Sequence, residues 1–352
     1  MKTISIAASR RYDVRIGPGL RKEAGAQLAS LFPGKRVMLV SDDRVWALYG
    51  EEVEDSLRAA GLDRCRFVFP HGERQKNLDT WSRLLEALCA ASLTRGDVIA
   101  ALGGGVVGDL AGFAAAAYRR GIPFVQLPTT LLAAVDSSVG GKTGLDLAGG
   151  KNQVGAFYQP WLVLCDTETL DTLSPEEVLG GSAEVVKYAM IGSEKLMQVL
   201  EADPAAARSE DVIAACVEMK RDYVLADEFD TGCRQMLNFG HTFGHAAELL
   251  SDYRIPHGQA VAMGMAVMTR SAAAAGLCSR ETADRLLGLL RRMGLPDTIP
   301  FPAEDVARAA RSDKKAQGSR LTLIVPERVG VCRAETVEAS ELTGWLHRGG
   351  RT

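Results

Sequence analysis

Three of the five histidines of this chain lie close together in the sequence, at His241, His245 and His257. An imidazole can bind a divalent metal ion or transfer a proton near neutral pH, so such a group indicates chemistry. Glu184, in the segment GSAEVVKY, supplies a carboxylate. Two imidazoles and one carboxylate make a zinc site with an open position for substrate. We therefore predict Glu184, His241 and His257 as metal ligands, with His245 free as an acid or base.

These residues also have ordinary structural interpretations. His241 and His245, in the pattern H-x-x-x-H, can be two packed or capping histidines. Glu184 and Lys187 have a spacing that is more typical of a solvated ion pair on a helix. The metal site is favoured only when the carboxylate and the imidazoles are taken together.

The segment RQMLNFGHTFGH adds two polar side chains to the histidines. Spacings of four, three and four place Arg234, Asn238, His241 and His245 on one stripe of a predicted helix. A guanidinium, an amide and two imidazoles would then face one space. The glycines in this segment cost helix stability, which favours close approach of another group.

A glycine-rich segment follows the apolar run DVIAAL, where Gly103, Gly105 and Gly108 have the spacing G-x-G-x-x-G. Glycines there let backbone amides approach a pyrophosphate, and the helix that follows adds its positive N-terminus. The alternative is tight packing alone. The acid expected about 20 residues later is missing. Asp42, at the end of the run RVMLV, is a better candidate for a ribose contact, or else a helix N-cap.

Further polar residues fit an anionic ligand. Thr129 and Thr130 follow another apolar run and would bind phosphate or cap a helix. Any single lysine is most often exposed to solvent. Together, however, the cations would hold a substrate that carries phosphate and carboxylate. They are Lys142 and Lys151 on predicted glycine-rich loops, Lys220 on a predicted helix, Lys314 and Lys315 in a polar loop, and Arg120 and Arg234.

The elements that must position these residues change in style near residue 175. Before it, apolar runs alternate with helical patterns, which is typical of a parallel sheet covered by helices. After the turn signal LSP the pattern is almost wholly helical. We predict an α/β domain with a Rossmann-like parallel sheet at 1–174 and a mainly α-helical domain at 175–352. Strands are predicted at 36–40, 66–69, 98–102, 124–127, 161–165 and 321–325, a hairpin at 4–16, and helices at 45–59, 78–90, 175–190, 205–227, 235–250, 257–275, 280–293 and 302–311.

Length and composition agree with this plan. The 352 residues exceed what one hydrophobic core usually organises. With 47% hydrophobic and 24% charged residues the chain is globular, and a net charge of -3 favours neither nucleic acid nor a membrane surface as partner. The seven cysteines are odd in number and widely spread, as in a reduced cytosolic protein. No signal peptide or membrane span is recognised, so we expect a cytoplasmic location.

The sequence resembles the 3-dehydroquinate synthase family over nearly its whole length. The resemblance is densest in the run from GGGVVGDLAGF to GGKNQVGAFYQP, in GSAEVVKYAMI and in LNFGHTFGHAAE. It implies an N-terminal domain that binds NAD, a C-terminal helical domain that carries Zn²⁺ or Co²⁺, an active site between them, and a homodimer.

Matching motifs carry the functional residues of the family onto this chain. The implied metal ligands are again Glu184, His241 and His257. The implied NAD contacts are Asp42, Glu73, Lys76, Gly105, Val106, Val107, Gly108, Asp109, Thr129, Thr130, Lys142, Lys151, Thr169, Leu170, Asp171 and Thr172. The implied substrate contacts are Asp136, Lys142, Asn152, Lys187, Lys220, Arg234, Asn238, His245, one of Lys314 and Lys315, and Arg120 from the neighbouring subunit. His245, Asn238, Lys142 and Arg234 are the catalytic candidates.

The resemblance implies conversion of 3-deoxy-D-arabino-heptulosonate 7-phosphate to 3-dehydroquinate and phosphate in the shikimate pathway of aromatic amino acid biosynthesis. Three alternatives are another sugar phosphate cyclase, making 2-deoxy-scyllo-inosose or a valiolone, an iron-type polyol dehydrogenase, and a regulator that binds nucleotide and metal without turnover. One departure from the family is His257-Gly258-Gln259, where His-Gly-Glu is commoner. The neutral amide would alter the surroundings of the ligand histidine.

Overall fold

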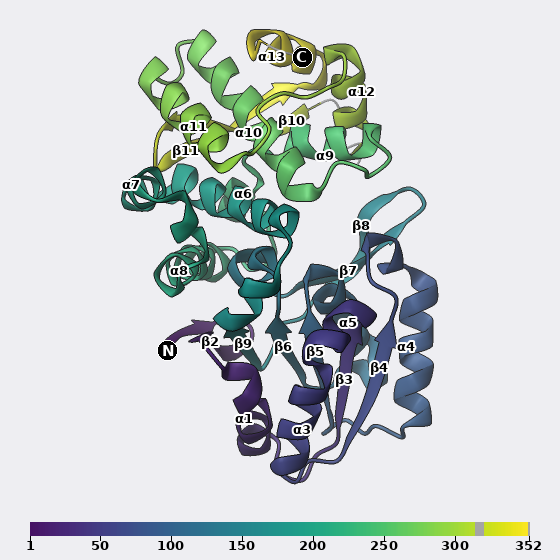
Figure 1. Ribbon diagram of the computed structural model, residues 1–352. Helices are drawn as coiled ribbons and strands as arrows, with labels where there is room; N and C mark the ends of the chain where they lie inside the picture. Colours follow the sequence, from purple (N-terminus) through teal and green to yellow (C-terminus); the bar gives the residue numbers. More distant parts are fainter. Residues whose placement is uncertain (314–319, 351–352) are drawn as a thin grey trace. The chain divides into compact units, whose positions relative to one another are not determined.

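The computed structural model describes residues 1–313 and 320–350. Its contacts divide these residues into two compact units, coloured along the chain in Figure 1. Unit 1 comprises Met1–Ser174 and Lys220–Phe229, and unit 2 comprises Pro175–Met219 and the chain from Asp230 onward.

Unit 1 is built on a seven-stranded sheet with the order β1-β2-β9-β6-β5-β3-β4. Only β1 and β2 pair antiparallel, while the other neighbours are parallel. The predicted parallel sheet and opening hairpin are therefore confirmed. The strands are β1 (Lys2–Ala7), β2 (Arg11–Gly17), β3 (Val37–Asp42), β4 (Arg64–Phe69), β5 (Val98–Gly103), β6 (Phe124–Pro128) and β9 (Leu162–Asp166).

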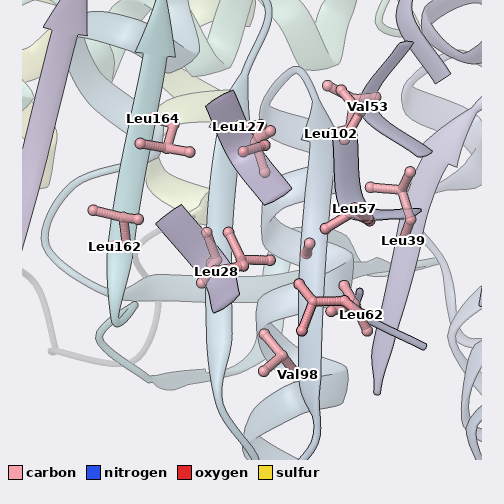
Figure 2. Close-up of a cluster of buried hydrophobic side chains, with 14 of the residues drawn as sticks. Leu28, Leu39, Val53, Leu57, Leu62, Val98, Leu102, Leu127, Leu162 and Leu164 are labelled. Atoms are coloured by element: carbon pink, nitrogen blue, oxygen red, sulfur yellow. The ribbon is translucent and has the colours of Figure 1, made fainter. Parts of the chain in front are cut away.

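Helices cover both faces of this sheet because successive strand residues point to opposite sides. Leu39 on β3 packs with Leu28 of α1 (Ala24–Leu31) and Leu57 of α3 (Glu51–Ala59), in the cluster drawn in Figure 2. The next residue, Val40, packs on the other face with α4 (Leu78–Ala90) and α5 (Gly105–Ala117). Strands buried on both faces read as continuous apolar runs, which is why the sequence revealed them.

A second, two-stranded sheet in unit 1 was not expected. β7 (Lys142–Leu147) and β8 (Gly150–Phe157) form an antiparallel hairpin. Lys142 and Lys151 therefore lie on strands, and their predicted place on glycine-rich loops is wrong. Glycine-rich strands escape a search for apolar periodicity because their residues carry little side chain to alternate.

Unit 2 is mainly helical, as predicted. α6 begins at Pro175 with acidic Glu176 and Glu177 in its first turn, a favourable helix start. Its helices are α6 (Pro175–Gly192), α7 (Glu194–Ala202), α9 (His241–Leu250), α10 (His257–Ala274), α11 (Arg280–Met293), α12 (Ala303–Asp313) and α13 (Leu342–Arg348), and α8 (Glu210–Ala226) is shared between the units at Met219 and Lys220.

Three elements predicted in the helical part differ in the structure. The helix expected at 205–227 is a 3-10 helix at Pro204–Arg208 followed, after a break at Ser209, by α8. The single helix expected at 235–250 is a 3-10 helix at Cys233–Asn238 followed, after a break, by α9. The single late strand is one half of an antiparallel pair, β10 (Arg320–Arg328) with β11 (Val331–Glu338). In the described parts of the chain no helix has the length and apolar character needed to cross a bilayer.

Candidate functional site

The side chains of Glu184, His241 and His257 converge within unit 2, and their possible ligand atoms all lie within 4.8 Å of one another. Glu184 Oε1 is 3.6 Å from His241 Nε2 and 3.4 Å from His257 Nε2. One carboxylate oxygen and two imidazole nitrogens are ligands suited to Zn²⁺ or Co²⁺. The donor set therefore fits a divalent transition metal.

The other ring nitrogen of each histidine is held by an acceptor. His241 Nδ1 lies 3.1 Å from the carbonyl oxygen of Phe239, and His257 Nδ1 lies 3.1 Å from Glu248 Oε2. An acceptor at Nδ1 favours the proton on that nitrogen and leaves the lone pair on Nε2. The Nε2 atoms of both rings face Glu184, which is the geometry that metal ligation requires.

Close contacts between glycine backbones bring these side chains together. Gly240 has a φ of 80°, so the chain turns there and α9 starts at His241. A Cβ on Gly264 of α10 would lie 1.9 Å from the carbonyl oxygen of Gly240. A Cβ on Gly258, beside His257, would lie 2.1 Å from the carbonyl oxygen of Gly180 in α6. The three helices that carry the group thus pack more closely than larger residues would allow.

Lys187 adds a positive charge to the group. Its Nζ lies 2.5 Å from Glu184 Oε2, and both side chains are 1% exposed. The interpretation as a solvated ion pair is wrong, because the second half of α6 is buried. Burial and, more weakly, the positive charge of Lys187 both lower the pKa of His241.

The two candidate ligands His241 and His257 differ in protonation. Burial lowers the pKa of His241 to about 3, so this ring is neutral at pH 7. Burial also opposes the charging of His257, but Glu184 and Glu248 outweigh it and raise the pKa to about 10. A bound metal cation would take over the positive charge that His257 otherwise carries between two carboxylates.

Arg234 and Asn238 do not share a helix with His245. The first two lie on the 3-10 helix at Cys233–Asn238, and His245 lies on α9. The predicted stripe is therefore wrong, since the turn at Gly240 separates the two elements. Arg234 is nevertheless fully buried, and the His245 ring centroid lies 5.3 Å from that of His241 and 5.8 Å from that of His257.

Glu248 is a residue that sequence reasoning missed. It is 1% exposed, and its carboxylate is the partner of His257 Nδ1. The pattern H-x-x-x-H-x-x-E, from His241 to Glu248, was the available signal. Gln259, which was predicted to alter the surroundings of His257, is not among its ion-pair partners in the described residues, which are Glu184 and Glu248.

The predicted nucleotide contacts of unit 1 gather at the carboxyl ends of parallel strands. β3 pairs with β4 on one side and with β5 on the other, so the strand order reverses between β3 and β5. Asp42 ends β3 and Gly103 ends β5. Open α/β sheets bind ligands at such a switch point.

Two of the three motif glycines are explained by packing. A Cβ on Gly103 would lie 2.5 Å from Val107 Cγ2, and one on Gly108 would lie 2.6 Å from Gln126 Oε1. Either contact is too short for a real side chain, so the packing interpretation holds for these two positions.

Gly105 and Thr129 point instead to a ligand. Gly105 is the first residue of α5, and the backbone N–H groups in the first turn of a helix have no hydrogen-bond partner within that helix. The hydroxyl of Thr129 is buried and has no hydrogen-bond partner among the residues that the structure describes. Free amides beside an unsatisfied hydroxyl suit a phosphate oxygen, so the segment fits a dinucleotide.

Several other predicted contacts have local roles. Asp42 Oδ1 accepts a hydrogen bond from Val45 N at 2.8 Å, and Thr130 Oγ1 accepts one from Ala133 N at 3.2 Å, so both cap helices. Thr169 Oγ1 donates to the Asp166 carbonyl at 2.7 Å. In the same 3-10 helix Leu170 is buried, Asp171 and Thr172 are exposed, and Thr172 Oγ1 donates to the Thr169 carbonyl.

Charged candidates of unit 1 occur in pairs. Lys76 Nζ lies 2.6 Å from Asp109 Oδ2, and Lys151 Nζ lies 3.1 Å from Glu73 Oε1. Lys220 is paired with Asp136. These pairs orient the side chains before any ligand binds.

Arg120 lies in an unusual backbone conformation. It is exposed and has a φ of 65°, directly after Arg119 with a φ of 48°. Two consecutive residues in the left-handed region are strained and persist only where the surroundings hold them. Lys142 is also exposed, whereas Lys314 and Lys315 lie outside the described residues.

Both halves of the chain match models of one family. Residues 66–180 match the 3-dehydroquinate synthase N-terminal model, and residues 181–316 match the 3-dehydroquinate synthase C-terminal model. The chain is 43% identical to 3-dehydroquinate synthase of Caulobacter vibrioides over 363 residues, covering 98% of each protein. It is 42% identical to that of Streptococcus sanguinis over 344 residues, covering 96% of this chain and 97% of the other.

Solved structures of related cyclases share the fold. One is 2-epi-5-epi-valiolone synthase from Streptomyces hygroscopicus with NAD⁺ and Zn²⁺ bound, at 27% identity, a TM-score of 0.89 and 98% coverage of each chain. Another is 2-deoxy-scyllo-inosose synthase complexed with carbaglucose-6-phosphate, NAD⁺ and Co²⁺, at 27% identity, a TM-score of 0.88, and coverage of 98% and 99%. The two family models and the 3-dehydroquinate synthases of Caulobacter vibrioides and Streptococcus sanguinis place the chain in the 3-dehydroquinate synthase family.

Proposed function

We propose that this enzyme converts 3-deoxy-D-arabino-heptulosonate 7-phosphate to 3-dehydroquinate and phosphate. NAD is the recycled cofactor, and Zn²⁺ or Co²⁺ is the metal. Identity to the 3-dehydroquinate synthase of Caulobacter vibrioides is 43% over almost the whole chain, against 27% for the two cyclases with other products. This difference favours the substrate that carries a carboxylate.

The convergence of Glu184, His241 and His257, with the Nε2 atoms of both histidines facing the carboxylate, is the observation that carries the proposal. These residues would hold the metal, which when bound would polarise a substrate hydroxyl, and NAD would supply a hydride acceptor and donor for the carbon that carries it. The overall conversion is redox-neutral. The C–O bond to phosphate and the C–O bond that closes the sugar ring break, and one C–C bond forms the carbocycle.

The remaining residues of unit 2 bind the substrate and transfer protons in this proposal. His245 lies beside the ligand histidines and takes up and returns protons at its ring. Asn238 orients a hydroxyl, while Lys187 and Arg234 stabilise negative charge with little exposure to water.

Residues of unit 1 would hold the cofactor and the anionic end of the substrate. The amides at Gly105 and the hydroxyl of Thr129 support binding of the NAD pyrophosphate. Asp42 is proposed for the ribose. Lys142, Asn152 and the pair of Lys220 with Asp136 are proposed for the substrate.

An assay of phosphate release with the purified protein tests this function. Equal amounts of phosphate and dehydroquinate should form from the heptulosonate phosphate, with no net NADH. A chelator should abolish both, and added Zn²⁺ or Co²⁺ should restore them. Preferred turnover of a sugar phosphate without a carboxylate would favour another cyclase, and lasting NADH with glycerol would favour a polyol dehydrogenase.

The proposal extends to a cytoplasmic homodimer. All seven cysteines are free thiols, as expected of a protein in a reducing compartment. The dimer is proposed from the family resemblance, in which Arg120 serves the neighbouring subunit. The partner of the enzyme is thus a second copy of itself, besides its small-molecule substrate.

A further inference from the structure

A buried lysine connects two candidate residues of unit 1. Lys76 is 5% exposed, and its Nζ lies 2.6 Å from Asp109 Oδ2 and 2.6 Å from Asn152 Oδ1. Burial by itself lowers the pKa of Lys76, but Asp109 and Glu73 outweigh it and raise the pKa. The ammonium is therefore charged at neutral pH and is fixed between two acceptors.

Backbone contacts hold Asn152 at this lysine. The Lys76 carbonyl accepts a hydrogen bond from Asp146 N at 2.9 Å, and Asp146 Oδ1 accepts one from Asn152 N at 2.8 Å. Asn152 has a φ of 53°, in the left-handed region that asparagine tolerates better than most residues. These contacts anchor the β7–β8 hairpin so that the Asn152 side chain is held against Lys76.

The contact with Lys76 decides which end of the Asn152 amide faces outward. An amide has an acceptor oxygen at one end and two N–H donors at the other. Since Oδ1 accepts from Lys76, the Nδ2 donors must point away from it. Asn152 is exposed, and its recorded bonds use only Oδ1 and the backbone N–H, so within the described residues Nδ2 is left to solvent or a ligand.

We propose that Lys76 is a positioning residue, which fixes the Asn152 amide with its donors toward an oxyanion of the substrate. The inference rests on the proposed function, in which Asn152 contacts the substrate. Without the lysine the amide can rotate by half a turn and present its oxygen, which repels an anion. Lys76 therefore acts on the substrate through Asn152.

A purely structural role for Lys76 makes a different prediction. If the lysine served only to neutralise the buried Asp109, its loss would lower the stability of unit 1 without a selective effect on substrate affinity. The two roles are separated by comparing KM with kcat and with the urea concentration at half unfolding.

The test is a double-mutant cycle with Lys76→Met and Asn152→Ala, assayed with heptulosonate phosphate at saturating NAD. Each single variant should raise KM about tenfold, as expected for loss of one hydrogen bond to an ion, and change kcat by less than about threefold. The double variant should have the KM of Asn152→Ala alone, because the lysine has nothing left to orient. Gln153→Ala is the matched control, since within the described parts of the chain the side chain of this exposed neighbour hydrogen-bonds only to the Lys151 carbonyl.

Two further variants keep the test decisive. If Lys76→Met folds poorly, a variant with both Lys76→Met and Asp109→Asn takes its place in the cycle. That variant removes both charges of the pair, so neither is left without its partner. Asn152→Asp keeps the shape and the contact with Lys76 but loses both donors, so its KM should rise at least as much as that of Asn152→Ala. If the enzyme is active and KM rises about 100-fold in the double variant, the two substitutions act independently, and the role of Lys76 through Asn152 is overturned. A wild-type protein that fails to turn over this substrate would instead reject the proposed function itself.

Discussion

At the scale of single residues, His257 is defined by the carboxylates on its two nitrogens. Glu184 lies at Nε2 and Glu248 at Nδ1, and both carboxylates are 1% exposed. A carboxylate behind a ligand histidine fixes its tautomer and raises its basicity, which strengthens metal binding.

Glu248→Gln should therefore weaken Zn²⁺ binding by about 10- to 100-fold while the fold is kept, because the amide has the same shape but no charge. Competition with a metal-binding dye measures the affinity. Glu281→Gln, at an exposed position in the first turn of α11, serves as control. An unchanged affinity would show that the charge of Glu248 contributes nothing to the site.

His257→Ala should strip the metal, because two remaining ligands hold Zn²⁺ poorly. Metal analysis of the purified variant, together with a urea unfolding curve to show that it is folded, provides the readout. A full equivalent of metal in the folded variant would remove His257 from the ligand set.

Five histidines left few candidates for imidazole ligands, whereas Glu184 had to be chosen among 44 acidic residues by its place in the segment GSAEVVKY. Their surroundings were not predictable to the same degree. Glu248 looked like an ordinary helix residue, and its role depends on burial and on the direction of His257 Nδ1. Burial likewise separates the Glu184–Lys187 pair from the solvated pairs that have the same spacing.

At the scale of elements, the contact of α10 with the start of α9 decides whether the ligands can meet. The backbone of Gly264 lies so close to Gly240 that any side chain at position 264 collides with a carbonyl oxygen. Gly264→Ala should lower the free energy of unfolding by about 1–3 kcal/mol through overpacking.

Urea unfolding in the presence of chelator measures this effect without a contribution from metal binding. Gly288→Ala in α11 is the matched control, since among the described residues no atom outside its own stretch of helix lies within 4 Å of the added Cβ. That variant should gain up to about 1 kcal/mol from the helical preference of alanine. Equal effects at the two glycines would contradict the close-packing argument.

Elements with strong apolar patterns were predicted from sequence, and elements defined by glycine were not. The strands of the main sheet and most helices of unit 2 bury continuous or periodic apolar residues, which leave a readable pattern. Gly240 interrupts a helical pattern through its backbone conformation alone, so the sequence suggested one helix where two elements exist. The glycine-rich β7–β8 hairpin was missed for the related reason that its pairing is made by backbone groups.

At the scale of the whole molecule, the segment Lys220–Phe229 belongs to unit 1, and long-range polar contacts hold it there. Lys220 pairs with Asp136, and Glu228 accepts hydrogen bonds from Ser9 and Gln159. Such contacts join residues far apart in sequence and have no local periodicity. The pattern of the sequence therefore shows where the helical part begins but gives no sign that one later segment belongs with the sheet.

The proposed homodimer leads to a prediction that only an assembly can satisfy. If Arg120 serves the neighbouring subunit, Arg120→Ala and His257→Ala should each be nearly inactive alone but should complement each other when their subunits exchange. Random mixing makes half of the dimers mixed, and in each of these one site has both its own metal ligands and a partner's arginine, so about a quarter of wild-type activity should return. Activity after joint unfolding and refolding of the two variants measures this recovery, with a mixture that is never unfolded as control. If Arg120 acts within its own subunit, every site in a mixed dimer still lacks one of the two residues, and the refolded mixture would be no more active than its parts.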